Sequence, residues 1–456
     1  MDSFIPDSRI HELMERRPDP SRVQEILQKS RRLERLSMDE TAELLAVTDP
    51  DLLQAIFEAA KSVKDDIYGS RLVLFAPLYI SNLCKNDCAY CAFRVSNKGV
   101  KRRALSMDEI RQETEFLLKT GQKRVLLVSG EAYPRDGLEY VLDAIATVYS
   151  ARDGQNSIRR LNVNIAPLEV GDFARLKEAE VGTYQIFQET YHEPTYKKLH
   201  TFGPKSDYLY RLSAIDRAFA GGLDDVGVGI LFGLYDYRYE VLALMAHIEH
   251  LEKNFGMGPH TISVPRLEPA EGAPLAAQPP YPVSDADFKK VIAVMRLSVP
   301  YTGLILSTRE TPEIRAASFD LGVSQISAGS RTNPGGYSED GACEQFSLGD
   351  HRGLDEVVRD ICTHGYLPSF CTSCYRLGRT GLDFMEFAKP GAIKEKCLPN
   401  ALFTFEEYLI DYASEETRAV GRALMDRKLA DVPEALRLVV NSQLAKIRSG
   451  ERDLFM

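Results

Sequence analysis

The sequence predicts a complete parallel (βα)8 TIM-type barrel, with a helical extension before it and a mostly helical C-terminal domain after it. Eight short apolar segments alternate with segments of helical periodicity, which is typical of a closed parallel sheet. Polar side chains gather where the apolar segments end, and six of the eight cysteines fall into two groups of three. A chain of 456 residues is long enough for a barrel with two flanking segments.

The first part of the chain, residues 1–66, is polar and helical in pattern. Ser37 and Glu40 precede an apolar run and match a capping box, which predicts the start of a helix. We therefore expect a helical extension that packs on a larger body.

The barrel is expected over residues 67–365. Ser106 and Glu109 form a capping pair that opens a predicted helix over Met107–Lys119, and Ser284 precedes another over Asp285–Leu297. The predicted strands are Arg71–Ile80, Arg124–Gly130, Leu161–Pro167, Thr183–Thr190, Val226–Gly233, His260–Arg266, Gly303–Arg309 and Ser324–Ser330.

Polar residues recur at the carboxyl ends of these strands, which is the face where barrels carry their active sites. This set predicts a site at that end: Ser129, Gly130, Glu131, Asn164, Glu189, Arg266, Arg309 and Arg331.

The strand–helix alternation stops near residue 366, so residues 366–456 are expected to form a separate C-terminal iron–sulfur domain. Its apolar periodicity predicts helices over Phe403–Ala413 and Pro433–Ile447.

Composition limits the classes of partner. The net charge of −10 argues against nucleic-acid binding, and the longest apolar runs are too short to cross a membrane. The first residues lack the apolar core of a secretion signal, so we expect a cytoplasmic protein without disulfides.

The first cysteine group, Cys84, Cys88 and Cys91, has the spacing C-x3-C-x2-C directly after a predicted strand. Three thiolates on one short loop suit an iron–sulfur cluster in which one iron stays open. The alternative is a zinc knuckle that uses Cys88 and Cys91.

The second group, Cys371, Cys374 and Cys397, again offers three thiolates, so we expect a second cluster, with structural zinc or an inert C-x2-C turn as alternatives. Cys343 and Cys362 stand alone and are interpreted as small buried apolar residues.

The first cysteine loop resembles the signature of the radical S-adenosylmethionine (SAM) superfamily, with Tyr90 before the last cysteine. The resemblance implies a 4Fe–4S cluster whose open iron binds SAM. It also implies a set of cofactor contacts. Tyr90 would pack on adenine, Ser129-Gly130-Glu131 would meet the amino group, and Glu189 and Arg211 would serve ribose or amino and carboxylate. Asn164 is a further implied SAM contact. Glu189 and Arg211 could instead form an ion pair at the barrel rim.

Five segments extend the resemblance over nearly the whole chain, to the HydG family, the radical SAM tyrosine lyases of [FeFe]-hydrogenase maturation. They are NVNIAPL, YQIFQETYH, GPHTISVPRL, SAGSRTNPGGY and CTSCYRLGRTG. This resemblance implies cleavage of the Cα–Cβ bond of L-tyrosine to p-cresol and dehydroglycine, and conversion of dehydroglycine to carbon monoxide and cyanide. These products would form an iron–carbonyl–cyanide unit of the H-cluster on a labile iron at the second cluster. Implied partners are a one-electron reductant such as ferredoxin or flavodoxin, free L-cysteine, the maturation scaffold GTPase and the other radical SAM maturase.

A bound tyrosine needs a cation for its carboxylate, and a guanidinium suits it best. Arg309 is our first candidate and Arg331 the second, although either could pair with a nearby acid such as Glu310. His260 is the candidate ligand of the labile iron, ahead of His200, His192 and His250, but its place at the amino end of a predicted strand counts against it.

Three other functions remain possible from the sequence. One is a tyrosine lyase (2-iminoacetate synthase) of thiamine thiazole synthesis, in which the second cysteine group would be dispensable. The others are a non-catalytic iron–sulfur carrier and a zinc-binding structural protein.

Overall fold

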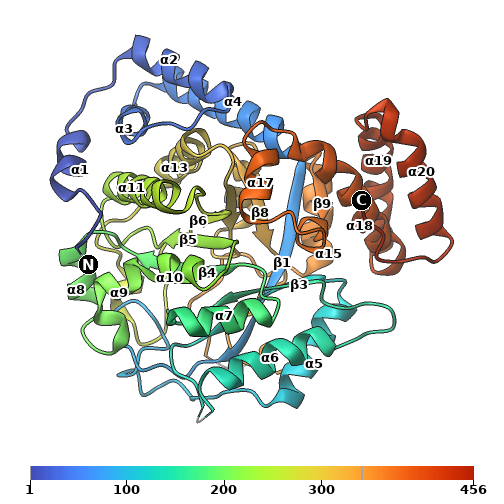
Figure 1. The fold of residues 1–456 in the computed structure, drawn as a ribbon, viewed down its shortest axis with the longest axis horizontal. Coiled ribbons are helices and arrows are strands. Elements are labelled where there is room, and N and C mark those ends of the chain that lie inside the picture. Colours follow the sequence, from blue (N-terminus) through green and yellow to red (C-terminus); the bar gives the residue numbers. More distant parts are fainter. Residues whose placement is uncertain (1, 135, 340–342) are drawn as a thin grey trace.

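A computed structural model describes residues 2–134, 136–339 and 343–456, and its centre is a closed parallel barrel (Figure 1). Strands β1 to β8 pair in sequence order, and β1 pairs with both β8 and β2, which closes the ring. The strands are β1 Arg71–Ser81, β2 Arg124–Ser129, β3 Arg160–Asn164, β4 Tyr184–Glu189, β5 Val226–Ile230, β6 Thr261–Ser263, β7 Gly303–Leu306, β8 Val323–Ser327 and β9 Leu367–Ser369. The predicted (βα)8 barrel is therefore confirmed.

Helices connect successive strands and cover the outside of the barrel. They are α5 Met107–Lys119, α6 Leu138–Ser150, α7 Val170–Glu178, α8 Glu193–Leu199, α9 Tyr208–Leu212, α10 Ala214–Ala220, α11 Tyr237–Phe255, α12 Pro274–Ala277, α13 Asp285–Ser298, α14 Pro312–Phe319 and α15 Leu354–Thr363, with a 3-10 turn, η1, at Pro204–Ser206. The capping box of Ser106 and Glu109 opens α5 as predicted.

Four helices precede the barrel: α1 Asp7–Met14, α2 Pro20–Arg31, α3 Met38–Leu45 and α4 Pro50–Tyr68. The capping box of Ser37 and Glu40 opens α3. Helix α4 packs against α13 on the barrel wall, and α1 packs against α11. The helical extension thus lies on the outside of the barrel.

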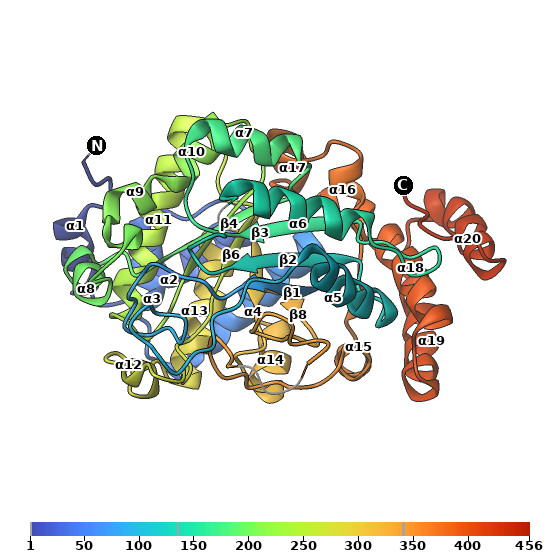
Figure 2. The same cartoon turned by 90° about the horizontal axis from the view of Figure 1, so that it is seen from below.

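The C-terminal part contains α16 Ser373–Arg376, α17 Gly381–Ala388, α18 Ile393–Asp411, α19 Glu415–Ala430 and α20 Glu434–Arg448. It is joined to the barrel by β9, which pairs with the first three residues of β1, Arg71–Val73. Because β9 begins at Leu367, this segment continues the barrel sheet, and the expected domain boundaries stay a prediction. Figure 2 shows α18–α20 at one end of the barrel and α8 toward the other.

Several predicted element bounds were wrong. Strand β6 ends at Ser263 rather than at Arg266, because Pro265 has no N–H to donate to a neighbouring strand. Strands β7 and β8 also end three residues early, since the chain leaves the ladder to line a cavity. Helix α18 begins at Ile393 rather than Phe403, and Pro399 lies inside it, where the proline cannot donate a backbone hydrogen bond. The apolar periodicity after Pro399 is what placed the predicted start too late.

Candidate active site

The first cysteine group lies on the loop that leaves the carboxyl end of β1. Cys84, Cys88 and Cys91 all line one cavity of about 190 Å³ inside the barrel. The guanidinium of Arg102 donates to four backbone carbonyls of this loop, including those of Asn82 and Phe93 at 3.0 and 2.8 Å. These contacts hold the loop in one shape, so the three thiols face a common space.

Hydrogen bonds to sulfur are typical of ligated thiolates, because an N–H donor stabilises the charged form. The backbone N–H of Asn86 donates to Sγ of Cys84 at 3.4 Å, and the Gln345 side chain donates to Sγ of Cys91 at 3.7 Å. Burial raises the pKa of the Cys91 thiol to about 11, so the metal-free thiol is neutral at physiological pH. A bound cation is therefore needed to draw the proton from it.

Four charged side chains meet beside this loop, all of them at least four-fifths buried. Glu131 accepts from Arg211 at 2.8 Å and from Asn86 at 2.7 Å, while Lys205 donates to Glu189 at 2.6 Å. Burial alone would raise the pKa of the Glu131 carboxyl, but Arg211 and Lys205 hold it below its usual value. Glu131, Glu189, Lys205 and Arg211 thus form a group of two cations and two carboxylates, which we call the neutral quartet.

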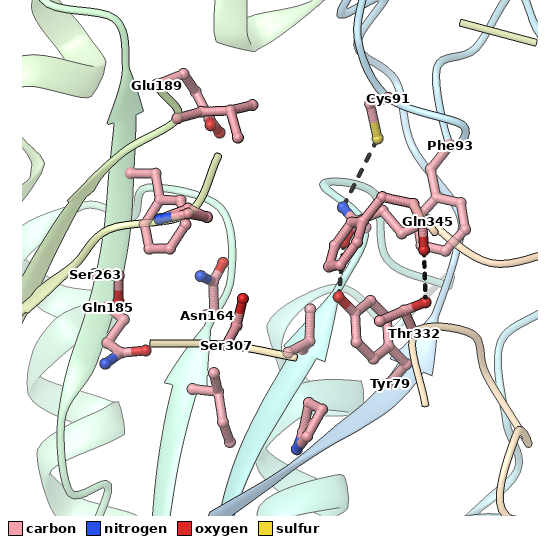
Figure 3. Close-up of a pocket in the computed structure, with 18 of the residues that line it drawn as sticks. Tyr79, Cys91, Phe93, Asn164, Gln185, Glu189, Ser263, Ser307, Thr332 and Gln345 are labelled. Atoms are coloured by element: carbon pink, nitrogen blue, oxygen red, sulfur yellow. Dashed lines mark hydrogen bonds between the residues drawn. The ribbon is translucent and has the colours of Figure 1, made fainter. Parts of the chain in front are cut away.

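Glu189 adopts a strained backbone conformation, with φ of +70°, at a register shift between β4 and β5. A non-glycine residue in the left-handed region costs free energy, and such strain is concentrated at functional sites. The irregularity turns the Glu189 carboxylate toward the cavity, where Figure 3 shows it across from Cys91.

Close packing explains the glycine of the Ser129-Gly130-Glu131 segment. A Cβ atom on Gly130 would lie 2.2 Å from the carbonyl oxygen of Leu83, which directly precedes Cys84. The N–H of Gly130 donates to the carbonyl of Ser81 at 2.8 Å, and the N–H of Ala132 donates to that of Leu83. Only glycine lets this segment lie against the cysteine loop.

Arg309 and Arg331, the two candidate carboxylate receptors, lie in different cavities. Arg309 lines the central cavity and its guanidinium lies 3.2 Å from the ring centroid of Phe346. Within the described parts of the chain it has no ion-pair partner, since Glu310 is paired with Arg266 instead. Burial lowers the pKa of Arg309 from its usual value. Arg331 lines a neighbouring surface cavity and donates to the carbonyl of Ser330.

The structure also places Tyr90 and Asn164 at the central cavity. The hydroxyl of Tyr90 donates to Nε2 of His200 at 2.7 Å, because the other ring nitrogen, Nδ1, donates to the carbonyl of Tyr196. Figure 3 shows Asn164 deeper in the cavity, near Ser307 and Gln185. Ser129 lines the cavity as well, so all candidates of this site except Arg266 and Arg331 are brought together. Arg266 pairs with Glu310 instead.

The second cysteine group lies at the opposite end of the barrel. Cys371 follows β9, and Cys371, Cys374 and Cys397 line a smaller cavity of about 50 Å³ at the amino ends of the strands. Burial raises the pKa of the Cys374 thiol to about 12. Arg71 and Arg124 line the same cavity, and the Arg124 guanidinium donates to the carbonyl of Cys371 at 2.9 Å.

His260 lines this second cavity, beside Phe384 with ring centroids 4.1 Å apart. Its Nδ1 is buried without a hydrogen-bond partner in the described residues and lies 3.5 Å from a carboxylate oxygen of Asp225. Burial lowers the pKa of His260. Its position at the amino end of β6, which counted against it, is the end where the second cysteine group lies.

The two cavities share the interior of one barrel. Along β1, Arg71 and Val73 line the smaller cavity, whereas Phe75, Pro77 and Tyr79 line the larger one. Alternate residues of a strand face the same side, and the eight steps from Arg71 to Tyr79 span roughly 26 Å at about 3.3 Å each. The side of β1 that faces the barrel interior therefore extends from one cysteine group to the other.

Three residues of the site were missed in the sequence. Lys205 lies on η1 between two helices, where the strand-end pattern gives no signal. Asn86 stands between the first two cysteines and could have been found there. Gln345 accepts from Tyr79 and donates to Cys91, but nothing in its local sequence marks it (Figure 3).

The arrangement of the sulfur atoms bears on the zinc alternative. A tetrahedral zinc with Zn–S bonds of about 2.3 Å brings its sulfurs to roughly 3.8 Å from one another. In the described part of the chain, neither cysteine group holds all three sulfurs within 4.8 Å of one another. Neither group is therefore arranged for one tetrahedral zinc ion unless its sulfurs move closer together.

Comparisons with known proteins agree with this geometry. The Radical SAM superfamily model matches residues 78–247, and the Biotin and Thiamin Synthesis associated domain matches residues 263–367. The chain is 33% identical to the 2-iminoacetate synthase of Salmonella typhimurium over 335 residues, covering 73% of this chain and 86% of that protein.

Two solved structures are similar over nearly the whole chain. One is HydG, described as a maturase of the [FeFe]-hydrogenase, with a TM-score of 0.97, 48% identity and full coverage of both chains. The other is HydG from Carboxydothermus hydrogenoformans, with a TM-score of 0.84, 42% identity and coverage of 96% of this chain and 97% of that one. None of the described helices has both the length and the hydropathy needed to cross a membrane.

Members of this superfamily use a 4Fe–4S cluster and SAM, and the first cysteine loop with its neutral quartet fits both. The chain is therefore a radical SAM lyase that belongs to the HydG family of [FeFe]-hydrogenase maturases.

Proposed function

We propose that this protein cleaves the Cα–Cβ bond of L-tyrosine to p-cresol and dehydroglycine, and converts dehydroglycine to carbon monoxide and cyanide for an iron–carbonyl–cyanide unit of the H-cluster. The observation that carries this proposal is the pair of cysteine groups at opposite ends of one barrel interior. A single-site lyase would not need the second group.

The neutral quartet is proposed to bind the methionine part of SAM by exchange of ion pairs. The SAM amino group would take the place of a cation beside Glu131, and its carboxylate would take the place of an acid beside Arg211. Because each charge already has an opposite neighbour, exchange leaves no buried charge unpaired. Tyr90 is proposed to pack on adenine. When bound, the reduced cluster supplies an electron that cleaves SAM and yields a 5′-deoxyadenosyl radical.

Arg309 is proposed to bind the carboxylate of L-tyrosine. Its guanidinium reaches the cavity without an acid to neutralise it in the described residues, and Phe346 fixes its plane. A buried cation without a partner is costly, so a carboxylate ligand there gains both a hydrogen-bonded ion pair and relief from that cost. Asn164 and Ser307 offer polar contacts deeper in the cavity.

The second cavity is proposed to convert dehydroglycine. Cys371, Cys374 and Cys397 would hold a second cluster, and His260, with its buried and unpartnered Nδ1, would anchor the labile iron. Free L-cysteine is a further proposed ligand, and Arg71 and Arg124 supply positive charge for anionic ligands. Ferredoxin or flavodoxin, the scaffold GTPase and the other radical SAM maturase are the proposed protein partners.

The close approach of Gly130 gives a testable prediction. Gly130→Ala would force its Cβ against the Leu83 carbonyl and shift Glu131 away from the cysteine loop. A displacement of about 1 Å in a positioning group can lower a rate by about 100-fold, and we expect that loss in SAM cleavage. The measurement is 5′-deoxyadenosine formed per cluster under reducing conditions. Gly171→Ala is the matched control, since no atom lies within 4 Å of its added Cβ, and equal losses in both variants would contradict the prediction.

The proposed function is tested by an oxygen-free assay of the reconstituted protein with SAM, a strong reductant and L-tyrosine. We expect p-cresol, carbon monoxide and cyanide to appear together. Cleavage of SAM with tyrosine left intact would contradict the proposal that L-tyrosine is the substrate.

The second candidate is a tyrosine lyase of thiazole synthesis, which the 33% identity to a 2-iminoacetate synthase favours. In that case p-cresol and glyoxylate would appear without carbon monoxide or cyanide. The C-terminal cysteine group favours the maturase.

A further inference from the structure

A cluster of two histidines and one aspartate lies on the outer surface, away from both cysteine groups. Asp7 and His11 are one turn apart on α1, and His192 is the residue that precedes α8. One ligand atom from each of these three side chains lies within 4.8 Å of the other two. Helix α1 and the loop after β4 are far apart in sequence, so tertiary packing creates this cluster.

The two imidazole rings are held in place by contacts of their Nδ1 atoms. Nδ1–H of His11 donates to the backbone carbonyl of Asp7 at 3.0 Å, which leaves a free lone pair on Nε2. Nδ1 of His192 shares a hydrogen bond of 2.8 Å with Thr195. Metal-binding histidines commonly have their second nitrogen engaged in this way, because the contact fixes ring orientation and tautomer.

Aromatic residues complete the surroundings of the cluster. The ring of His192 stacks on Tyr235, with centroids 3.8 Å apart and planes at 5°. The hydroxyl of Tyr239 donates to Oδ1 of Asp7 at 2.7 Å, while Oδ2 lies 3.6 Å from Nδ1 of His11.

We propose that Asp7, His11 and His192 form a binding site for one divalent transition-metal ion of the zinc type, with water as the remaining ligand. Two imidazoles and one carboxylate are a donor set that zinc prefers, whereas calcium and magnesium prefer oxygen ligands alone. This site is independent of the proposed tyrosine chemistry.

An ion at this position would tie α1 to the support of the first cysteine loop. His192 stands at one end of α8, and at its other end the carbonyl of Leu199 accepts from the N–H of Ala89, beside Cys88. His200 follows and accepts from Tyr90. The ion would therefore connect α1 to the N-terminal end of α8, while the C-terminal end of α8 contacts the first cysteine loop.

The test is zinc binding by the holoenzyme with its iron–sulfur clusters already loaded, compared between wild type and His11→Ala. We expect one zinc per chain in the wild type and an affinity at least about 100-fold lower in the variant, because loss of a direct ligand exceeds the effect of losing an outer contact. His364→Ala is the matched control. His364 also stands four residues after an aspartate, with Nδ1 2.9 Å from the carbonyl of Asp360, but it belongs to no such three-residue group among the described residues. Equal zinc affinity in wild type and His11→Ala would overturn the proposal.

X-ray absorption at the zinc edge separates this site from zinc bound by cysteines. We expect only nitrogen and oxygen ligands at about 2.0–2.2 Å, and sulfur at about 2.3 Å as a main ligand would overturn the assignment. Asp7→Asn is the second variant and is expected to lower zinc affinity as well. Zinc should also slow hydrogen exchange in α1 of the wild type but not of His11→Ala, and equal slowing in both would contradict the site.

Discussion

Cys374→Ala is expected to retain p-cresol formation and to lose carbon monoxide and cyanide completely. The first cysteine group and the quartet of Glu131, Glu189, Lys205 and Arg211 lie at the other end of the barrel, so the change leaves the tyrosine-cleaving end intact. Without three thiolates the second cluster loses a ligand, and dehydroglycine is expected to leave as glyoxylate. The measurement is a joint assay of p-cresol, both diatomic products and glyoxylate.

Two cysteine variants serve as controls for this experiment. Cys88→Ala is expected to abolish all products, because the first cluster is needed for SAM cleavage. Cys362→Ala changes a buried cysteine of α15 outside both groups and is expected to leave all products unchanged. Loss of p-cresol in Cys374→Ala with normal iron at the first site would contradict the division between the two ends.

Arg309→Ala is expected to lower kcat/KM for tyrosine by about 100-fold. A bidentate, charge-assisted contact to a carboxylate in a buried cavity is worth about 3 kcal/mol, which corresponds to that factor. Arg309→Lys is expected to recover only part of the loss, since an ammonium cannot reproduce the planar fork. The measurement is initial p-cresol formation across a range of tyrosine concentrations.

Arg331→Ala provides the matched comparison, because the structure places Arg331 in a neighbouring cavity. We expect its kcat/KM for tyrosine to stay within a few-fold of the wild type. If Arg331→Ala caused the larger loss, the assignment of the carboxylate receptor would be reversed. SAM affinity should be unchanged in both variants, which separates substrate binding from cofactor binding.

The barrel could be predicted from the sequence because each strand is a short apolar run between helical segments, and the two capping boxes marked helix starts correctly. Strand ends were less predictable. Apolar and polar residues both continue past the last paired residue of β7 and β8, and only tertiary structure shows where pairing stops. Strand β9 is three residues long and carries no periodicity of its own.

The first site could be predicted largely from local spacing, since its three cysteines are on one loop. Lys205 could not, because its role depends on η1 bringing it to Glu189 from outside any strand. The placement of His260 beside the second cysteine group depends on β9 joining the amino end of β1. That pairing joins segments that are nearly 300 residues apart, which no local pattern encodes.

The three partners of β1 also set an order of assembly during synthesis. The loop with Cys84 leaves the ribosome early and lies next to β2, which follows soon after it. Ring closure waits for β8, and β9 can pair with Arg71–Val73 only after residue 369 has been made. Such non-local pairing is slow, so a nascent chain exposes Arg71 and its neighbours for most of its synthesis. The second cysteine group can therefore form only after β9 and the first turns of α18 have been made, later than the first group on the loop after β1.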